Sequence, residues 1–240
     1  MKYIYYFCGS YTIVYMLEQE LFYERDLFFL LNGSNSVFLD NFFYLYSYKW
    51  TWIPFYACLL FVFLYKRTWK EIVWTIVAIV ALITLCDQIS SGIFKPLFHR
   101  LRPSHHPDFK EMVDLVFNYR GGGYGFISSH ASNAFGLATF TALLFKNRFY
   151  TATIMLFALL TAYSRVYLGL HFISDVVFGS LVGAALGWGI YGIDRWVRKK
   201  YLRVESNYSS KNIRFVIIAY FVFVLILVLF NNQLVYSIHH

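Results

Sequence analysis

Long apolar runs that are almost free of charge constrain this chain more than any other feature of its sequence. A run of about 20 apolar residues is long enough to cross the hydrocarbon core of a bilayer as a helix. The runs lack the alternation that marks the strands of a membrane barrel. Because a backbone in hydrocarbon must satisfy its own hydrogen bonds, we expect membrane helices. Six are predicted, near residues 51–65, 72–94, 130–145, 149–168, 171–193 and 213–230.

The composition is that of an integral membrane protein. Charged residues make up 14% of the chain, whereas a soluble domain carries about 25%. The net charge of +8 is compatible with nucleic acid, anionic lipid or an anionic substrate as partner. Nucleic-acid binding requires a basic face on a soluble surface, so we expect no nucleic-acid partner. The three cysteines are widely spaced among apolar residues and imply neither a disulfide framework nor a zinc site.

The sequence predicts an all-α membrane protein, a bundle of six transmembrane helices preceded by an interfacial helix. Residues 17–31 place apolar side chains on one helical face and charged side chains off it, and Asn32-Gly33 ends the pattern. Residues 1–15 are apolar but short. The sequence leaves open whether they cross the membrane or act as a signal segment, and whether translation starts at Met1 or Met16.

We divide the chain into three parts. Residues 1–49 form the N-terminal segment with the interfacial helix, residues 50–195 form a five-helix core, and residues 196–240 form a basic loop and the sixth helix. The loops after the first, third and fifth predicted helices contain 12 of the 21 Lys and Arg residues. Cytoplasmic loops carry such an excess, so we expect these loops inside and the loops after the second and fourth helices outside. The sequence does not predict an oligomeric state.

Two acidic residues, Asp87 and Asp175, lie within the predicted spans, and an ionisable residue at membrane depth indicates a functional site. His171 and Asp175 are four residues apart at the start of the fifth predicted helix, so we expect them on one face. A carboxylate there can hold one imidazole nitrogen and leave the other for a substrate, as in a catalytic triad. An Asp that caps a helix beside a neutral His would give the same spacing.

Three cations are expected at the outer ends of helices. Lys95 closes the second predicted helix, which Pro96 should stop, Arg102 follows seven residues after Lys95, and Arg165 lies near the end of the fourth. One cation at a helix C-terminus has a structural explanation, but burying three together requires an anion. Arg binds phosphate bidentately and Lys as a point charge. Asp87 lies eight residues before Lys95. Two roles are open for it: a partner for a site cation, or one member of an ion pair that joins helices.

Glycine-rich residues 121–125 precede Ser128, Ser129 and His130, which open the third predicted helix. The glycines allow a tight loop with positive φ, and either serine can cap the helix, whose free N–H groups form an anion site. A flexible linker would have the same composition. On the fifth helix, glycines at four-residue steps predict close packing within the bundle, with a dimer face as the alternative. They are Gly179, Gly183 and Gly187.

Together these residues resemble the three-part signature of the type-2 phosphatidic acid phosphatase superfamily, which includes lipid phosphate phosphatases and vanadium haloperoxidases. The parts are Lys95-x6-Arg102-Pro103, Ser128-x-His130 and Ser164-Arg165-x5-His171-x3-Asp175. The first and third match at every fixed position, and the resemblance covers about residues 51–195. The second part departs from the family's Pro-Ser-Gly-His, because Ser129 adds a side chain where the backbone should approach phosphate.

The resemblance implies a metal-independent phosphatase without a cofactor. His171 would attack phosphorus to form a phosphohistidine, Asp175 would orient the imidazole, and His130 would protonate the leaving oxygen and later help to activate water. The phosphoryl oxygens would be held by Lys95, Arg102, Arg165, the Ser128 hydroxyl and the Ser129 N–H. Phosphoryl transfer depends mostly on positioning and charge stabilisation, so fixed cations can do what magnesium does elsewhere.

The implied substrate is a lipid phosphate or pyrophosphate at the outer face of the bacterial cytoplasmic membrane. Undecaprenyl pyrophosphate is favoured, because the compact six-helix chain resembles bacterial members of that kind. Phosphatidylglycerol phosphate, phosphatidate and lipid A phosphate are the alternatives. A transporter or flippase for anionic lipid is the rival class, but the sequence lacks the paired broken helices typical of transporters. A phosphotransferase that passes the phosphoryl group to another lipid would share every catalytic residue.

Overall fold

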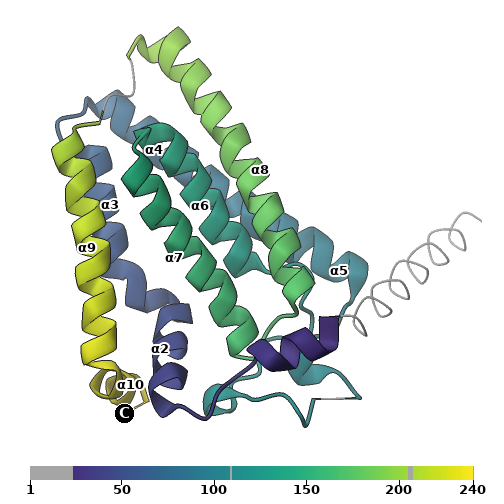
Figure 1. The fold of residues 1–240 in the computed structure, drawn as a ribbon. Coiled ribbons are helices and arrows are strands. Elements are labelled where there is room, and N and C mark those ends of the chain that lie inside the picture. The colour runs from purple at the N-terminus through teal and green to yellow at the C-terminus, as the bar shows by residue number, and fades with distance from the viewer. Residues whose placement is uncertain (1–23, 109, 205–207, 240) are drawn as a thin grey trace, which may run out of the picture.

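A computed structural model describes residues 24–108, 110–204 and 208–239 (Figure 1). Within these residues the regular structure is helical, apart from an isolated bridge between Leu101 and Tyr124. The helices are α2 (Val37–Ser47), α3 (Ile53–Leu64), α4 (Trp69–Asp87), α5 (Lys95–Phe98), α6 (Ser129–Phe145), α7 (Arg148–Tyr167), α8 (Ile173–Val197), α9 (Ser210–Leu229) and α10 (Asn231–His239). The prediction of an all-α membrane protein is confirmed for this part of the chain.

Each of the six predicted apolar runs forms a helix, but fewer reach the length of a full span. Four segments of the described chain are long and apolar enough to cross a membrane: Trp69–Phe98, Arg148–Tyr167, Ile173–Leu202 and Ser210–Leu229. The first predicted span is the shorter helix Lys49–Leu64. The third is α6, which has 17 residues, most of them buried. A count of six spans is therefore not confirmed.

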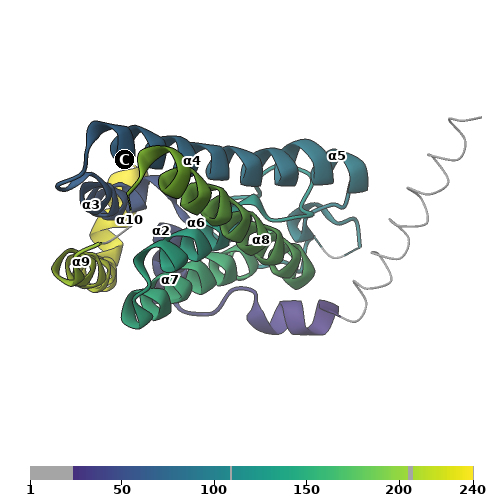
Figure 2. The same ribbon diagram turned by 90° about the horizontal axis from the view of Figure 1, so that it is seen from above.

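Helix α6 is the centre of the bundle and packs against α4, α7 and α8 (Figures 1 and 2). Helix α8 approaches it closely through the predicted glycine stripe. A Cβ atom on Gly183 would lie 2.1 Å from the carbonyl oxygen of Ser132, and one on Gly187 would lie 2.4 Å from that of Gly136. The stripe is thus a packing surface within the bundle, as predicted.

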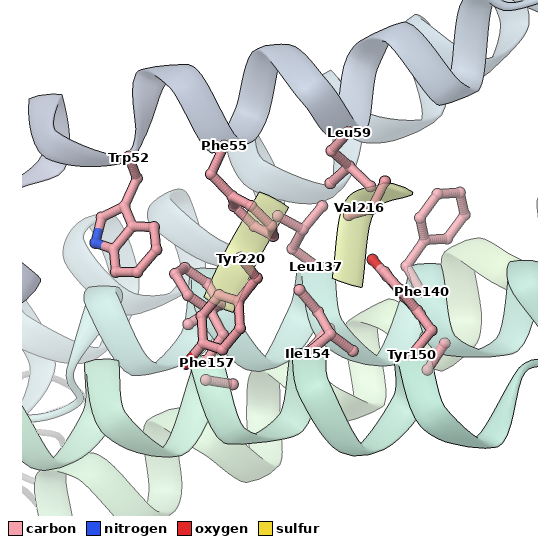
Figure 3. Close-up of a cluster of buried hydrophobic side chains, with 14 of the residues drawn as sticks. Trp52, Phe55, Leu59, Leu137, Phe140, Tyr150, Ile154, Phe157, Val216 and Tyr220 are labelled. Carbon is pink, nitrogen blue, oxygen red and sulfur yellow. The ribbon is translucent and has the colours of Figure 1, made fainter. Parts of the chain in front are cut away.

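The main hydrophobic core joins α3, α6, α7 and α9 (Figure 3). Aromatic rings dominate it: the Trp52 and Phe157 ring centroids are 4.7 Å apart, and the rings of Trp52 and Tyr220 stack. Such pairs stabilise a core by about 0.5–1.5 kcal/mol beyond the effect of burial. The core therefore ties α9 to α6, which begins at the second motif, and to α7, which ends in the third.

The prediction that Pro96 stops the second helix is wrong. Helix α4 continues through a π-helical segment, Gln88–Phe94, into α5, which ends at His99 with φ 48°. Pro96 lies in the first turn of α5, where a missing N–H group is tolerated. In this wider segment the backbone N–H of Lys95 bonds to the carbonyl oxygen of Ser90, five residues back.

The N-terminal part contains structure that the apolar runs did not indicate. Residues 24–31 are helical and the helix ends at Asn32-Gly33 as predicted, where Gly33 has φ +66°. Residues 1–15 and the first part of the expected interfacial helix lie outside the described residues. Helix α2 was not predicted, and its Asn41 bonds to Asn232 of α10 at 2.7 Å. The interfacial position of the first helix and the three-part division of the chain stay predictions.

The connections separate by charge as the sequence suggested. The loops that follow α3, α6 and α8 lie at one end of the bundle (Figure 1). The loop between α5 and α6 and the loop between α7 and α8 lie at the other end. The alternation of basic and other loops is therefore present in the fold, and the membrane side of each end stays a prediction.

Candidate active site

The three motifs converge at the end of the bundle where the long loop 99–128 meets the α7–α8 loop (Figure 1). The backbone N–H of Arg102 donates to Gly123 at 3.0 Å, and that of Gly125 donates to Arg100 at 2.8 Å. These bonds hold the first motif against the glycine-rich segment. The N–H of Ser128 donates to the carbonyl oxygen of Asp175 at 2.9 Å, which joins the second motif to the third.

A cavity of about 640 Å³ opens at this junction. Five of the eight predicted site residues line it: Lys95, Arg102, Ser129, His130 and His171. The other three, Ser128, Arg165 and Asp175, are buried and do not belong to its lining. Within the described chain, no group of three or more His, Cys, Asp or Glu side chains is arranged to hold a metal ion.

His171 and Asp175 form the predicted pair, but not on one helical face. His171 lies in the loop before α8, because the helix begins at Ile173. Its Nδ1 is 3.3 Å from Oδ2 of Asp175, and the same carboxylate oxygen accepts the backbone N–H of Phe172 at 3.0 Å. The carboxylate of Asp175 therefore caps the helix and also contacts the imidazole, a geometry compatible with both explanations that the spacing left open.

Behind this pair lies an ionic network that the sequence did not reveal. Arg100 donates to Oδ1 of Asp175 at 2.8 Å and also pairs with Glu24. Glu24 in turn accepts the backbone N–H of Ser174 at 2.9 Å and its hydroxyl at 2.8 Å. The side chains of Arg100 and Asp175 are 2% and 0% exposed, and a carboxylate so buried requires a cation partner. The sequence therefore indicated that a buried Asp175 needs a cationic partner, but it did not identify Arg100 as that partner.

Lys95 is positioned by two hydroxyl groups. Its Nζ donates to Ser91 at 3.1 Å and to Ser129 at 3.0 Å, and the two hydroxyl oxygens are 2.9 Å apart. Ser129 stands where the family has glycine, and its extra side chain thus supports a site cation. No hydrogen bond or ion pair joins Lys95 to Asp87 in the described chain, but Asp87 lines the same cavity and its charge acts on Lys95.

Both guanidinium groups of the signature are fixed by hydrogen bonds that leave other donors free. Arg102 Nε donates to the carbonyl oxygen of Tyr124 at 3.1 Å. Arg165 is 4% exposed and donates through Nη1 to Ser47, while its Nε has no partner among the described residues. Asp175 is already paired to Arg100, and among the described residues no ion pair joins Arg102 or Arg165 to a carboxylate. Asp87 is the one carboxylate in the described cavity lining, against the cations Lys95 and Arg102. An anion is the ligand that such a site selects.

Two of the four loop glycines are required by close approach. Gly121 has φ +67°, and a Cβ there would lie 2.5 Å from Nη1 of Arg102. A Cβ on Gly125 would lie 2.7 Å from Oδ2 of Asp175. Gly122 and Gly123 border open space, so a side chain would fit there. The segment thus brings backbone against the two charged groups rather than acting as a flexible linker.

Electrostatics favour a neutral His171. Burial lowers the pKa of His171 well below its usual value, and the charges of Arg102, Arg165 and Lys95 lower it further. A hydrogen bond to the backbone of Gly125 acts in the opposite direction but does not reverse the shift. When Nδ1 donates its proton to Asp175, the other ring nitrogen keeps a free lone pair. The arrangement is that of an oriented nucleophile beside an anion site.

Comparisons with known proteins agree with this geometry. The family model of the PAP2 superfamily matches residues 74–199. The chain is 42% identical to a lipid A 4'-phosphatase of Porphyromonas gingivalis over 91% of this chain and 95% of that protein. It is 40% identical to one of Bacteroides thetaiotaomicron, over 77% and 81%. A more distant relative is an undecaprenyl-diphosphatase of Sulfolobus acidocaldarius, 26% identical over 82% and 85%.

Among solved structures, the crystal structure of Aquifex aeolicus LpxE matches with a TM-score of 0.52 and 26% identity. The match covers 70% of this chain and 94% of that one. The chain belongs to the PAP2 superfamily, as its motifs indicated. It is a multi-pass bacterial membrane protein and a phosphatase of the class that acts on lipid phosphate esters.

Proposed function

We propose that the chain hydrolyses the 4'-phosphate ester of lipid A through a phosphohistidine on His171. The observation that carries this proposal is the buried His171–Asp175 pair, which meets His130, Lys95 and Arg102 around one cavity. The substrate rests on the two relatives of 40% identity or more, both of them lipid A 4'-phosphatases. The preference for undecaprenyl pyrophosphate is not confirmed, and lipid A phosphate replaces it.

In the first chemical step, the free ring nitrogen of His171 attacks phosphorus. The bond between phosphorus and the lipid oxygen breaks as the phosphorus–nitrogen bond forms. The negative charge of the bound phosphate offsets the neighbouring cations Arg165, Arg102 and Lys95, so His130 enters the step as an imidazolium and gives its proton to the leaving oxygen. The charge on the non-bridging oxygens is balanced by Lys95, Arg102, Arg165, the Ser128 hydroxyl and the Ser129 N–H. These groups are held by the protein in advance, so little reorganisation accompanies the reaction.

In the second step, water attacks the phosphohistidine. His130, now neutral, accepts the proton of the attacking water, and the phosphorus–nitrogen bond breaks to release inorganic phosphate. Both histidines return to their starting protonation states, so the cycle is closed. Asp175 stabilises the imidazolium character that His171 acquires in each step, and its own charge is supported by Arg100.

The cavity gives the lipid a place to enter from the side. Its polar end carries the site cations, and its other walls are apolar residues of α3, α6 and α7 that include Leu59, Leu137 and Phe157. A lipid bound there would place its phosphate on the cations and its chains along the apolar walls. From the distribution of Lys and Arg we propose that this end faces outward from the bacterial cytoplasmic membrane.

The test is phosphate release by the purified full chain in detergent with EDTA. Lipid A carrying both phosphates and undecaprenyl pyrophosphate are supplied separately, and mass spectrometry identifies the site of hydrolysis. We expect loss of the 4'-phosphate by wild type and by the control His99→Asn, whose exposed histidine is outside the cavity lining. His171→Asn should lower the rate by about a thousandfold or more.

Other results would overturn separate parts of the proposal. Hydrolysis of undecaprenyl pyrophosphate without hydrolysis of lipid A would reject the substrate. Full activity of His171→Asn would reject the nucleophile. Loss of activity in EDTA that magnesium restores would reject the metal-independent mechanism. Binding of lipid A without any hydrolysis would favour the transporter.

A further inference from the structure

A second polar pocket, of about 520 Å³, lies at the end of the bundle opposite the active site, where α6 and α8 end (Figure 1). Its charged lining comes from the residue that follows α6, from the last turn of α8 and from the π-helical segment and C-cap that follow α8. These residues are Lys146, Asp194, Arg195, Arg198, Lys199 and Arg203. Among the described residues of the lining, five are therefore cations and one is a carboxylate.

Asp194, the one carboxylate in the described lining, already has hydrogen-bond partners for both of its oxygens. Nε of Arg198 lies 2.9 Å from both oxygens of Asp194, and the indole N–H of Trp74 donates to Asp194 at 2.9 Å. Arg198 itself is 2% exposed, and its Nη2 donates to Thr75 at 2.7 Å. Its Nη1 makes no hydrogen bond in the described chain and lies 3.9 Å from Oε1 of Glu71. Asp194 thus neutralises the buried arginine and no other cation.

The other four cations are exposed at the pocket and have no acidic partner within the described part of the chain. Lys146 and Arg203 each end a helical segment with a left-handed backbone, at φ 50° and 54°. Glycine is the least strained residue at such a position, so cations occupy both places at a conformational cost. Charges of one sign that converge on one cavity repel one another unless an anion joins them.

A general excess of positive charge on one membrane side does not explain this convergence. Other cations at the same end sit over aromatic rings instead: Lys66 over Tyr65, Lys70 over Trp69 and Arg148 over Phe149. None of those three lines the pocket. Leu144 and Tyr191 complete its wall with apolar surface. The pocket thus combines a cationic cluster with apolar surface at the end of a membrane bundle.

We propose that this pocket binds a phosphate group, and that its source is the headgroup of an acidic phospholipid in the leaflet opposite the active site. Basic pockets between membrane helices bind such headgroups. Arg195, Lys199 and Arg203 present the donors that a phosphate accepts, with Arg198 as a buried floor. The same cluster would also take soluble phosphate, so the experiment separates the two sources. The site is independent of the catalytic cavity.

The pocket variant is Lys146→Gln/Lys199→Gln/Arg203→Gln, and the matched control is Lys66→Gln/Lys70→Gln/Arg148→Gln. Both remove three positive charges from the same end. In one arm, native mass spectrometry counts phosphatidylglycerol retained by the full chain in phosphatidylcholine nanodiscs. In the other arm, thermal unfolding in detergent is followed with inorganic phosphate or with chloride at equal ionic strength. Phosphatase activity of each variant shows that it is folded.

We expect wild type and control to retain phosphatidylglycerol, with an affinity about 100-fold lower in the pocket variant. Stabilisation by inorganic phosphate alone, lost in the pocket variant, would assign the site to a soluble anion. Equal binding by the pocket variant and the control in both arms would overturn the proposal. If the triple variant does not fold, Arg203→Gln is measured instead, with a smaller loss of about fivefold expected from one charge.

Discussion

Two serines show how single residues set the geometry of this active site. Ser91 and Ser129 hold the ammonium group of Lys95 between them, at 3.1 and 3.0 Å. Ser129 replaces the glycine that the second motif usually has, and Ser91 comes from the π-helical segment that precedes Lys95. The departure from the family pattern is therefore matched by a partner in another motif, and the two residues act on one cation.

Removal of either hydroxyl should weaken phosphate binding in the transition state. One hydrogen bond to a charged group contributes about 1.5–3 kcal/mol, so we expect Ser91→Ala and Ser129→Ala each to lower kcat/KM by roughly 10- to 100-fold. Because both serines act through Lys95, the double variant should lose less than the product of the two single losses. Steady-state kinetics of the three variants tests this. Fully multiplicative losses would show that the serines act separately.

The lowered pKa of His171 predicts the acid side of the pH profile. In the proposed mechanism the neutral imidazole is the nucleophile, and burial with nearby cations lowers its pKa so that it stays neutral below the usual histidine pKa. The acid limb of kcat/KM reports the free enzyme, so it should lie below pH of about 6.5. Arg102→Gln removes one of the charges that lower this pKa, and should move the limb to higher pH. A limb that stays in place would exclude His171 as the titrating group.

At the scale of elements, the contact between α6 and α8 sets the distance between the second and third motifs. Helix α6 begins directly after Ser128 and α8 begins directly after Phe172, so their packing places His130 relative to His171. The glycine stripe allows the two backbones to approach at Ser132 and Gly136. This contact was predictable because small residues at four-residue steps indicate a close helix pair.

Gly183→Ala should destabilise the protein, because its Cβ would lie 2.1 Å from a backbone oxygen. Overpacking of this kind costs about 1–3 kcal/mol. Gly189→Ala is the matched control: this glycine is on the same helix and its Cβ would meet nothing within 4 Å. The control should stabilise the helix by about 0.5–1 kcal/mol. Thermal unfolding in detergent compares the two. Equal melting temperatures for both variants would contradict the role of the stripe.

The elements that sequence reasoning missed share a physical cause. Apolar runs predicted the helices around the core, because helices that are buried in hydrocarbon or protein consist mostly of apolar residues. The π-helical segment could not be predicted in this way, since hydropathy does not show whether a backbone N–H bonds to the carbonyl group four or five residues back. The same limit led to the prediction of Pro96 as a helix end.

For the whole molecule, the fixed spacing of three motifs predicted most of the site before the fold was known. Lys95, Arg102, Ser129, His130 and His171 do line one cavity. Arg100 and Glu24 were missed because their role depends on which chain segments meet behind Asp175, 75 residues from Arg100 along the chain. The network connects the helix at residues 24–31 to the His171–Asp175 pair, so the site is assembled by more than the five-helix core.

The most direct test of the central claim is capture of the phosphohistidine. The full chain is mixed with lipid A labelled with ³²P at the 4'-phosphate, in EDTA, and quenched on the millisecond scale under alkaline conditions. We predict one acid-labile label per active chain, located at His171 by peptide mapping and missing in His171→Asn. Phosphate release by wild type with no labelled protein at any time, or with the label on another residue, would contradict this mechanism.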